Sequence, residues 1–215
     1  MNEKLESRFL DAWSKLRSDG PRGEPGMILK SLNHLYNSTD RFYHNLEHVE
    51  HGLEEIDFIR NRIEYPEEVE MAWFFHDAIY DSRAKDNEER SSWLSHALLA
   101  QNGIVADSIF RIDDLILTTK HSFKPEKKDE EYMVDIDLSI LGQAPEIFDR
   151  YERNIRQEYL WVPQEEFRIR RIDIMQGFLN RTSVYFTDHF IDKYEERARE
   201  NLERSIENLS AHCYA

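Results

Sequence analysis

The stretch PEEVEMAWFFHDAIYD, residues 66–81, decides the fold that we expect for this chain. Pro66 suits the first turn of an α-helix, and the segment MAWFFH that follows is almost wholly apolar, as in a helix buried on all sides. His76 and Asp77 stand where this helix should end. A carboxylate directly after apolar aromatic residues is costly to bury unless it is paired. Asp77 therefore either caps the helix end by accepting backbone hydrogen bonds or faces a cation.

The rest of the chain also predicts helices, because apolar residues recur at three- and four-residue steps and only seven glycines and six prolines interrupt them. A loop is expected in SDGPRGEPG, residues 18–26, and Pro145 and Pro163 fit the first turns of two late helices. We expect an all-α fold, a single compact helical bundle forming one domain over residues 1–215. Apolar stripes mark further helices over residues 5–16, 28–36, 44–63, 93–98, 105–116 and 190–206, with a short one around Asp137.

The order of histidines and aspartates along the chain predicts a metal site. His44 and His48 are four residues apart and would share one face of a helix, whereas the adjacent His76 and Asp77 cannot share a face in mid-helix. The second pair has to converge from two directions, and a metal ion held also by His48 and Asp137 would meet that need. Such a set leaves coordination positions open for water, so catalysis becomes possible.

Two alternatives stay open at the level of the residues. His44, His48 and His51 fall on one side of a helical wheel, roughly opposite the apolar stripe. Taken alone, this favours a solvated polar face, and we leave His51 to that interpretation. Asp135 and Asp137 compete for the last ligand position, and because they are two apart on a helix only one of them can reach the site.

Composition limits the classes of partner. With 215 residues and 40% hydrophobic content the chain suits one domain with a substantial core. Its 28 basic and 43 acidic side chains give a net charge of -15, which argues against a long nucleic acid as partner because binding one depends on neutralising phosphates. A small phosphorylated substrate remains compatible, since a metal and local bases supply positive charge.

Other sequence features predict the compartment and the assembly. The single cysteine, Cys213, cannot form an intramolecular disulfide and suits a reducing compartment. MNEKLESRF at the N-terminus does not resemble a signal peptide, and no run of about 18 apolar residues exists. We expect a cytoplasmic protein with no membrane partner, in which the acidic last helix serves packing or a homodimer.

The ordered set of residues resembles the HD superfamily of metal-dependent phosphohydrolases, whose motif His76-Asp77 matches. YHNLEH at 43–48 is similar to the YHNxxH segment of the cyclic-nucleotide phosphodiesterases, and DLS at 137–139 is similar to their distal Asp-Leu-Ser. The sequence from Arg41 through IRQEY at 155–159 to EERAREN at 195–201 is most similar to a group of small, stand-alone predicted HD phosphohydrolases. The likeness therefore covers nearly the entire chain and implies an HD-type helical fold.

The resemblance also implies the roles of individual residues. Its Asp-Leu-Ser context selects Asp137 over Asp135. His44 matches the first histidine of YHNxxH and would protonate the leaving oxygen, and Asp77 would act with it in catalysis. Phosphodiesterases carry a second-metal histidine four residues after the first histidine of their HD motif, but this chain has Tyr80 there, so the likeness does not extend to a binuclear site. The implied metal ligands are His48, His76, Asp77 and Asp137.

Basic residues outside this set are predicted to contact a phosphorylated substrate. Lys120 and His121 follow two threonines at an expected helix end, where they would grip phosphate or merely complement the helix dipole. Arg41 would clamp phosphate oxygens with its bidentate fork, and Arg156 and Arg181 are further candidates. Each of these arginines could equally form an ion pair in a chain this acidic.

Asp81 and Glu88 follow the HD motif, in a region where the resemblance continues. We expect them to support the metal ligands from a second layer. Glu88 follows Asn87 and equally suits the first turn of a helix, where its charge would complement the helix dipole.

Hydrolysis of a small phosphate ester, a nucleotide or a related compound, is the activity that we expect, with a divalent metal activating the attacking water. His and Asp ligands suit manganese, iron, cobalt, nickel, zinc and sometimes magnesium. Two alternatives remain: a nucleotide-binding regulatory module without turnover, and a di-iron oxidative enzyme on an HD-type fold. The intact ligand set argues against the first, and the second needs further histidines, of which His121 is the obvious spare one. Substrate identity is not readable from the sequence.

Overall fold

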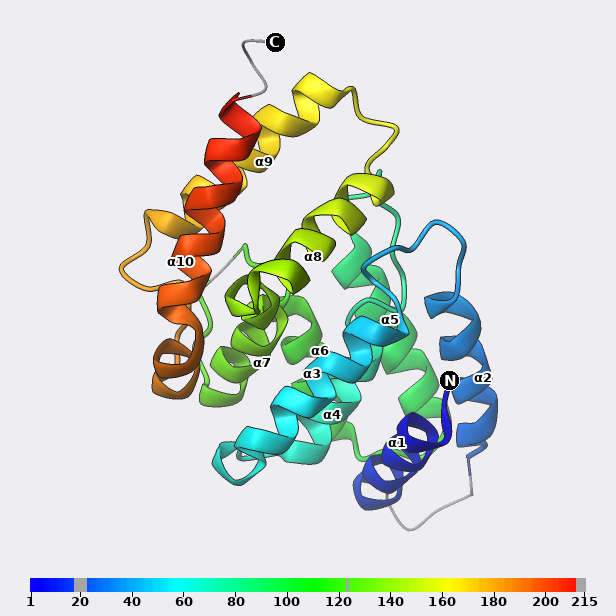
Figure 1. Cartoon of the computed structure of the whole chain (residues 1–215). Helices are drawn as coiled ribbons and strands as arrows, with labels where there is room; N and C mark the ends of the chain where they lie inside the picture. Colours follow the sequence, from blue (N-terminus) through cyan, green and yellow to red (C-terminus); the bar gives the residue numbers. More distant parts are fainter. Residues whose placement is uncertain (18–22, 123, 212–215) are drawn as a thin grey trace. The chain divides into compact units, whose positions relative to one another are not determined.

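The computed structural model describes residues 1–17, 23–122 and 124–211 (Figure 1). In this part of the chain the regular structure is helical, apart from one isolated bridge between Arg17 and Ile104, so the all-α prediction is confirmed. Cys213 and residues 18–22 lie outside the described residues. The α-helices are α1 (Glu3–Leu16), α2 (Pro25–Tyr36), α3 (Leu46–Ile59), α4 (Pro66–Phe75), α5 (Asn87–Gln101), α6 (Ala106–Thr118), α7 (Lys128–Leu138), α8 (Pro145–Glu158), α9 (Gln164–Leu179) and α10 (Asp188–Ala211), and the 3₁₀ helices are η1 (Arg60–Arg62) and η2 (Ser139–Gly142).

Prolines explain several helix starts. Pro25, Pro66 and Pro145 are the first residues of α2, α4 and α8, where a missing backbone N–H costs nothing. The expected loop is therefore shorter than predicted, because α2 already begins at Pro25. Pro163 does not lie in the first turn of α9 as predicted but caps it from the preceding position, with extended backbone. None of the described helices is long and apolar enough to cross a membrane.

The chain divides into two compact units, Met1–Ile136 and Asp137–Ala215, which are described separately. The single domain inferred from composition stays a prediction. The first unit is built around α4, which contacts α1, α3, α5 and α6. Residues Glu68–Phe75 of α4 are all buried, as its apolar sequence predicts. The buried carboxylate of Glu68 is compensated by Arg111, which donates one hydrogen bond of 2.6 Å to each of its oxygens.

Helix α5 packs with a face that its apolar pattern did not predict. Trp93 begins the apolar stripe that predicted this helix, but 79% of its surface is exposed. The buried face instead carries Ser91, Ser92, Ser95 and Leu99. Small hydroxyl side chains let the helix lie close to its neighbours, and Ser92 Oγ donates to Asp113 on α6 at 3.2 Å. The position of the apolar residues alone therefore predicted the helix but not its orientation.

In the second unit η2 lies against α8 and α10. The side-chain amide of Asn201 on α10 donates to the carbonyls of Leu141 and Gln143, both at 2.9 Å, and so ties the η2 segment to the helix. Gly142 leaves room for Tyr194, because a Cβ at position 142 would lie 2.5 Å from the Tyr194 Cβ. These contacts hold the segment that directly follows Asp137.

Candidate metal centre

His48 and His76 converge inside the first unit. His48 is the third residue of α3, and His76 caps the C-terminus of α4, as predicted for the end of a buried helix. Both are buried, with 4% and 1% of their surfaces exposed. Their Nε2 atoms lie 3.0 Å apart. Two nitrogens that bind one ion at about 2.0–2.1 Å are separated by about 3 Å, so this spacing fits a shared metal.

Trp73 orients both imidazoles. Its ring stacks on His76 with a centroid distance of 4.1 Å and lies 5.0 Å from the ring of His48. Its Nε1–H donates to the carbonyl of Val49 at 2.8 Å, next to His48 on α3. Gly52 makes room for the indole, because a Cβ at this position would lie 2.0 Å from Trp73 Cζ2. The apolar run predicted that Trp73 is buried, but no signal in the sequence indicated this support or the need for glycine at position 52.

The protonation of His76 follows from its backbone contact. His76 Nδ1 lies 2.8 Å from the carbonyl oxygen of Trp73, and since a carbonyl can only accept, Nδ1 carries the proton. The Nε2 atom then presents its lone pair towards His48. A metal-binding histidine typically donates its other nitrogen in this way. The arrangement needs a proton or a cation between the two Nε2 atoms, and a cation would serve the neighbouring carboxylates as well.

Asp137 supplies an oxygen to the same group. It is the first residue of the second unit but stands on α7, a continuous helix whose preceding residues belong to the first unit. One ligand atom each from His48, His76 and Asp137 lies within 4.8 Å of the others, so these residues could hold a metal ion. Asp135 is fully buried and is not part of the group. The choice of Asp137 from its Asp-Leu-Ser context therefore agrees with the structure.

Asp77 lies beside this group without being part of it. Its Oδ2 is 3.1 Å from His76 Nε2 and 3.7 Å from His48 Nε2. Burial raises the pKa of Asp77, but when the imidazoles are protonated the charges of His76 and His44, a hydrogen bond from His76 and the charge of His48 outweigh burial and hold this pKa well below its usual range. Asp77 is thus an anion facing both imidazoles. Its predicted place as a metal ligand stays a prediction.

His44 is close to the centre but not on the helix. The prediction that His44 and His48 share a helix face is wrong, because α3 begins at Leu46 and Asn45 is its N-cap, accepting a hydrogen bond from the backbone N–H of Glu47 at 2.8 Å. The His44 ring instead stacks on Tyr80 with a centroid distance of 4.0 Å.

The solvated polar face that the helical wheel suggested is also incorrect at its central member, since His48 is buried. His51 is half-buried and stays outside the metal-binding group.

Arg41 holds the backbone around the His-Asp pair. Its Nη1 donates to the carbonyls of Asp77 at 2.6 Å and His44 at 3.2 Å, and its Nη2 donates to the carbonyl of Ala78 at 2.8 Å. The guanidinium is buried and lies over the Tyr80 ring, 5.7 Å from its centroid. This geometry does not support the predicted phosphate clamp. Arg41 instead positions the two segments that carry His44 and Asp77.

The turn after the His-Asp pair is pinned by α5. The backbone N–H of Asp81 donates to Asn87 Oδ1, and Asn87 Nδ2 donates back to the carbonyl of Asp81, both at 3.0 Å. Ser91 Oγ accepts from the N–H of Ile79 at 3.0 Å and donates to its carbonyl at 3.2 Å. The carboxylate of Asp81 is exposed and accepts from the N–H of Arg83, so it shapes the turn. No motif in the sequence predicted that Asn87 and Ser91 would hold this turn.

Glu88 on α5 is half-buried, so burial raises its pKa, and the negative charge of Asp77 raises it further. Its support of the metal ligands stays a prediction. Lys120 was predicted to bind phosphate. In the structure its ammonium group forms an ion pair with Glu89. His121 follows the end of α6 with φ 55°, a left-handed backbone uncommon for a residue other than glycine. Their substrate contacts stay predictions.

A hollow of about 470 Å³ lies beside the centre, bordered by both Arg41 and Tyr80. His34 and Arg90 also line it, and sequence analysis singled out neither. Arg90 forms no ion pair or side-chain hydrogen bond among the described residues. In the sequence Arg90 is one basic residue among many on helices. Only the structure shows that it lines the hollow.

Arg156 and Arg181 belong to the second unit. Arg156 donates to the carbonyls of Tyr159 at 2.7 Å and Val162 at 3.1 Å, and the Arg181 guanidinium lies over the Phe178 ring, where burial lowers its pKa. Neither contact connects these arginines to the metal-binding group.

No protein-family model matches this chain, and no curated protein or solved structure matches it either. What the centre can do must be argued from its own residues.

Proposed function

We propose that this protein is a metal-dependent phosphohydrolase that acts on a small phosphate ester, with an HD-type centre. One observation carries the proposal: the histidine of α3, the histidine at the end of α4 and the aspartate of α7 bring their ligand atoms within 4.8 Å of one another, with Asp77 beside them. This is the ordered set of residues on which the resemblance to HD phosphohydrolases rests. Buried histidines that converge with carboxylates are otherwise costly in a protein core.

His48, His76 and Asp137 would hold the metal, with Asp77 as a further oxygen ligand. Two nitrogens and one or two carboxylates form a donor set for a borderline divalent ion such as manganese, iron, cobalt, nickel or zinc. A divalent metal held there would make water acidic enough to attack phosphorus near neutral pH and would screen the phosphoryl charge. The chain contributes by fixing the donor atoms: Trp73 holds the protonated Nδ1 of His76, and Arg41 holds the backbone of Asp77.

His44 is our choice for the proton donor to the leaving oxygen. It is half-buried, so its ring can reach both substrate and solvent, and Tyr80 holds that ring by stacking. General acid catalysis of this kind typically contributes about 10²- to 10⁴-fold in rate. Since Tyr80 occupies the position of the second-metal histidine of phosphodiesterases, we propose a single metal ion rather than two.

The hollow beside the centre would receive the substrate. Its volume of about 470 Å³ lies within the range of about 300–1,000 Å³ that small-molecule sites occupy. Tyr80 borders this hollow and also contacts His44, so a substrate body placed there would lie near the proton donor. Arg90 supplies a cation without a carboxylate partner among the described residues, which suits an anionic substrate.

Metal-dependent turnover is the test. Protein stripped with a chelator is assayed on chromogenic phosphate mono- and diesters while each divalent metal is added back. Activity restored by metal and abolished by His76→Ala and by Asp77→Ala supports the proposal. His51→Ala is the matched control, because it removes a histidine of α3 outside the metal-binding group.

Two other results would contradict the proposal. Tight metal and nucleotide binding without turnover would favour a regulatory module. Oxygen consumption that depends on two bound irons would favour oxidative chemistry.

A further inference from the structure

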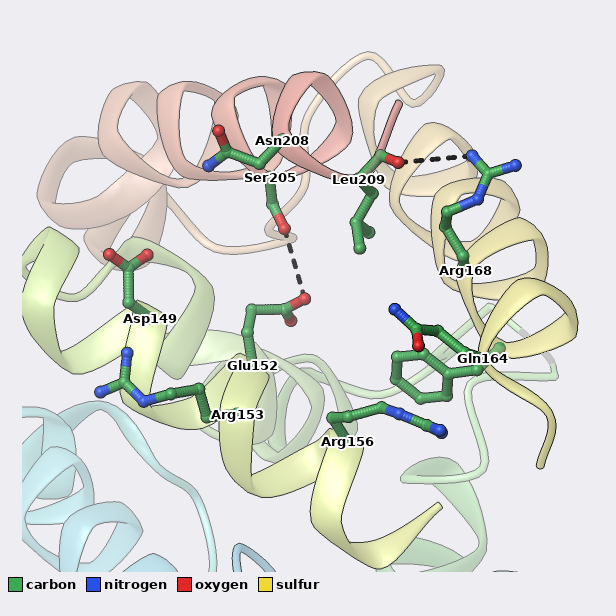
Figure 2. A pocket seen from close by; sticks show the side chains of 10 residues that line it. Asp149, Glu152, Arg153, Arg156, Gln164, Arg168, Ser205, Asn208 and Leu209 are labelled. Atoms are coloured by element: carbon green, nitrogen blue, oxygen red, sulfur yellow. Dashed lines mark hydrogen bonds between the residues drawn. The ribbon is translucent and has the colours of Figure 1, made fainter. Parts of the chain in front are cut away.

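The second unit contains a cavity that the proposed function does not use. It has a volume of about 370 Å³ and lies among α8, α9 and α10 (Figure 2). Its size is at the lower end of the range for small-molecule sites. Phe167 and Leu209 contribute apolar wall, whereas Gln164 and Asn208 contribute amide groups. A wall of this kind suits a small organic ligand better than a bare ion.

The acidic side chains that line the cavity are already neutralised. Glu152 forms an ion pair with Arg171 and accepts a hydrogen bond from Ser205 Oγ at 3.3 Å. Asp149 pairs with Arg204, whose Nη1 lies 2.7 Å from the Asp149 Oδ1. Neither carboxylate therefore leaves an uncompensated negative charge at the cavity.

Not all of the arginines that line the cavity are paired with a carboxylate. Arg168 pairs with Glu165 and also donates to the carbonyl of Leu209 at 3.4 Å. Arg153 and Arg156 form no ion pair with any carboxylate among the described residues. Three arginines and two carboxylates thus line the cavity. In a chain with a net charge of -15, such a local excess of positive charge is unusual.

Arg156 is the cation placed to meet a ligand. Two of its N–H groups donate to the carbonyls of Tyr159 and Val162. These hydrogen bonds hold the side chain in place but do not neutralise its charge. A guanidinium has five N–H groups, so three remain for an acceptor. Its Cζ lies 4.7 Å from the centroid of the Phe167 ring. Figure 2 shows Arg156 extending towards Gln164, whereas Arg153 extends on the other side of Glu152, towards Asp149.

We propose that this cavity binds a small organic anion, whose carboxylate or phosphate group meets the Arg156 guanidinium and whose apolar body packs against Phe167 and Leu209. The site stands on residues of the second unit alone and does not depend on the proposed phosphohydrolase activity. An arginine fixed by two backbone carbonyls and backed by an aromatic ring is preorganised for a planar or tetrahedral anion.

The test uses the fluorescent dye 1-anilinonaphthalene-8-sulfonate, an aromatic organic anion, titrated into the full chain. The informative variant is Gln164→Glu, which places a carboxylate on the wall of the cavity that Arg156 also lines, at the exposed start of α9, where a negative charge also suits the helix dipole. Gln176→Glu is the matched control, because it makes the same change on the exposed surface of α9 away from the cavity. Arg156→Gln is a second variant, checked for folding by circular dichroism because its loop contacts are lost.

Saturable binding of one dye, weakened about tenfold by Gln164→Glu and unchanged by Gln176→Glu, supports the site, since a charge-assisted hydrogen bond typically contributes that much or more. Displacement of the dye by phenylphosphonate or by benzoate then tells whether phosphate or carboxylate is preferred. Equal affinity in both glutamate variants, or no saturable binding, overturns the proposal. So does unchanged affinity in folded Arg156→Gln.

Discussion

For the substitution Gly52→Ala, helix propensity and the structure predict opposite changes in the stability of the protein. Alanine in the middle of a helix is favoured over glycine by about 0.5–1 kcal/mol, so propensity predicts a more stable protein. The structure predicts the reverse, because the new Cβ would lie 2.0 Å, 2.1 Å and 2.4 Å from Cζ2, Cε2 and Nε1 of Trp73. Trp73 is fully buried and bonded to the Val49 carbonyl, so the indole cannot move without losing that bond.

The magnitude follows from these two costs. Overpacking a core typically costs about 1–3 kcal/mol, and leaving a buried polar group unsatisfied costs about 1–3 kcal/mol more. After the gain in propensity, a net loss of about 3 kcal/mol is expected, which corresponds to about 6–12 °C in melting temperature for a chain of this size. Because the same indole stacks on His76, metal affinity should fall as well.

Equilibrium unfolding in denaturant measures the stability change. Gly177→Ala is the control, because Gly177 lies inside α9 and a Cβ there would meet nothing within 4 Å. This control should be neutral or slightly stabilised. A Gly52→Ala protein as stable as the wild type would refute the reasoning, and recovery on adding Trp73→Phe, with its smaller ring, would support it.

Three further outcomes are expected. A divalent metal at about 100 times its Kd should stabilise the protein by about 2.7 kcal/mol in thermal unfolding, and an equal effect in His76→Ala would place the metal elsewhere. Arg41→Gln should destabilise the first unit by about 2–3 kcal/mol, whereas a residue that only contacts substrate would change KM and leave stability intact. The pKa of Glu195 is lowered because hydrogen bonds from the Val184 N–H, Ser183 and Arg199 outweigh burial, which acts the other way and is the largest single effect. Its stabilisation is therefore present above the unfolded pKa near 4.5 and is lost as pH falls through the lower folded value. Glu195→Gln should cost about 2 kcal/mol at pH 7 with little difference from wild type in strong acid, and the exposed Glu196→Gln should show no such dependence in acid titrations of stability.

Local rules predicted the helices and one end of the site. The apolar run after Pro66 identified a buried helix, and His76 does stand at its end. Helix periodicity showed that only one of Asp135 and Asp137 could reach a site, and the resemblance selected the one that lies in the metal-binding group. These predictions succeeded because they depend on spacing along a single helix.

Predictions that needed the partner of a side chain were wrong or missing. The apolar residues from Trp93 onward predicted a helix, but the buried face of α5 carries its serines and Trp93 is exposed. The helical wheel taken alone favoured a solvated face for His48, and the ordered set of residues was needed to predict a ligand there; its ring lies against Trp73 of another helix. Arg41 was expected to clamp phosphate or to form an ion pair, but its guanidinium donates to the backbone carbonyls of His44, Asp77 and Ala78.

The sequence by itself determined the helical class and the identity of the residues able to bind a metal, because periodicity and ligand chemistry are properties of neighbouring residues and side-chain types. Only the tertiary structure decided that His48 and His76, 28 residues apart, bring their nitrogens to 3.0 Å. It also decided that Gly52 must lack a side chain and that Arg156 keeps an uncompensated charge. Those properties depend on which helices pack together, and packing is set by contacts between residues far apart in the chain.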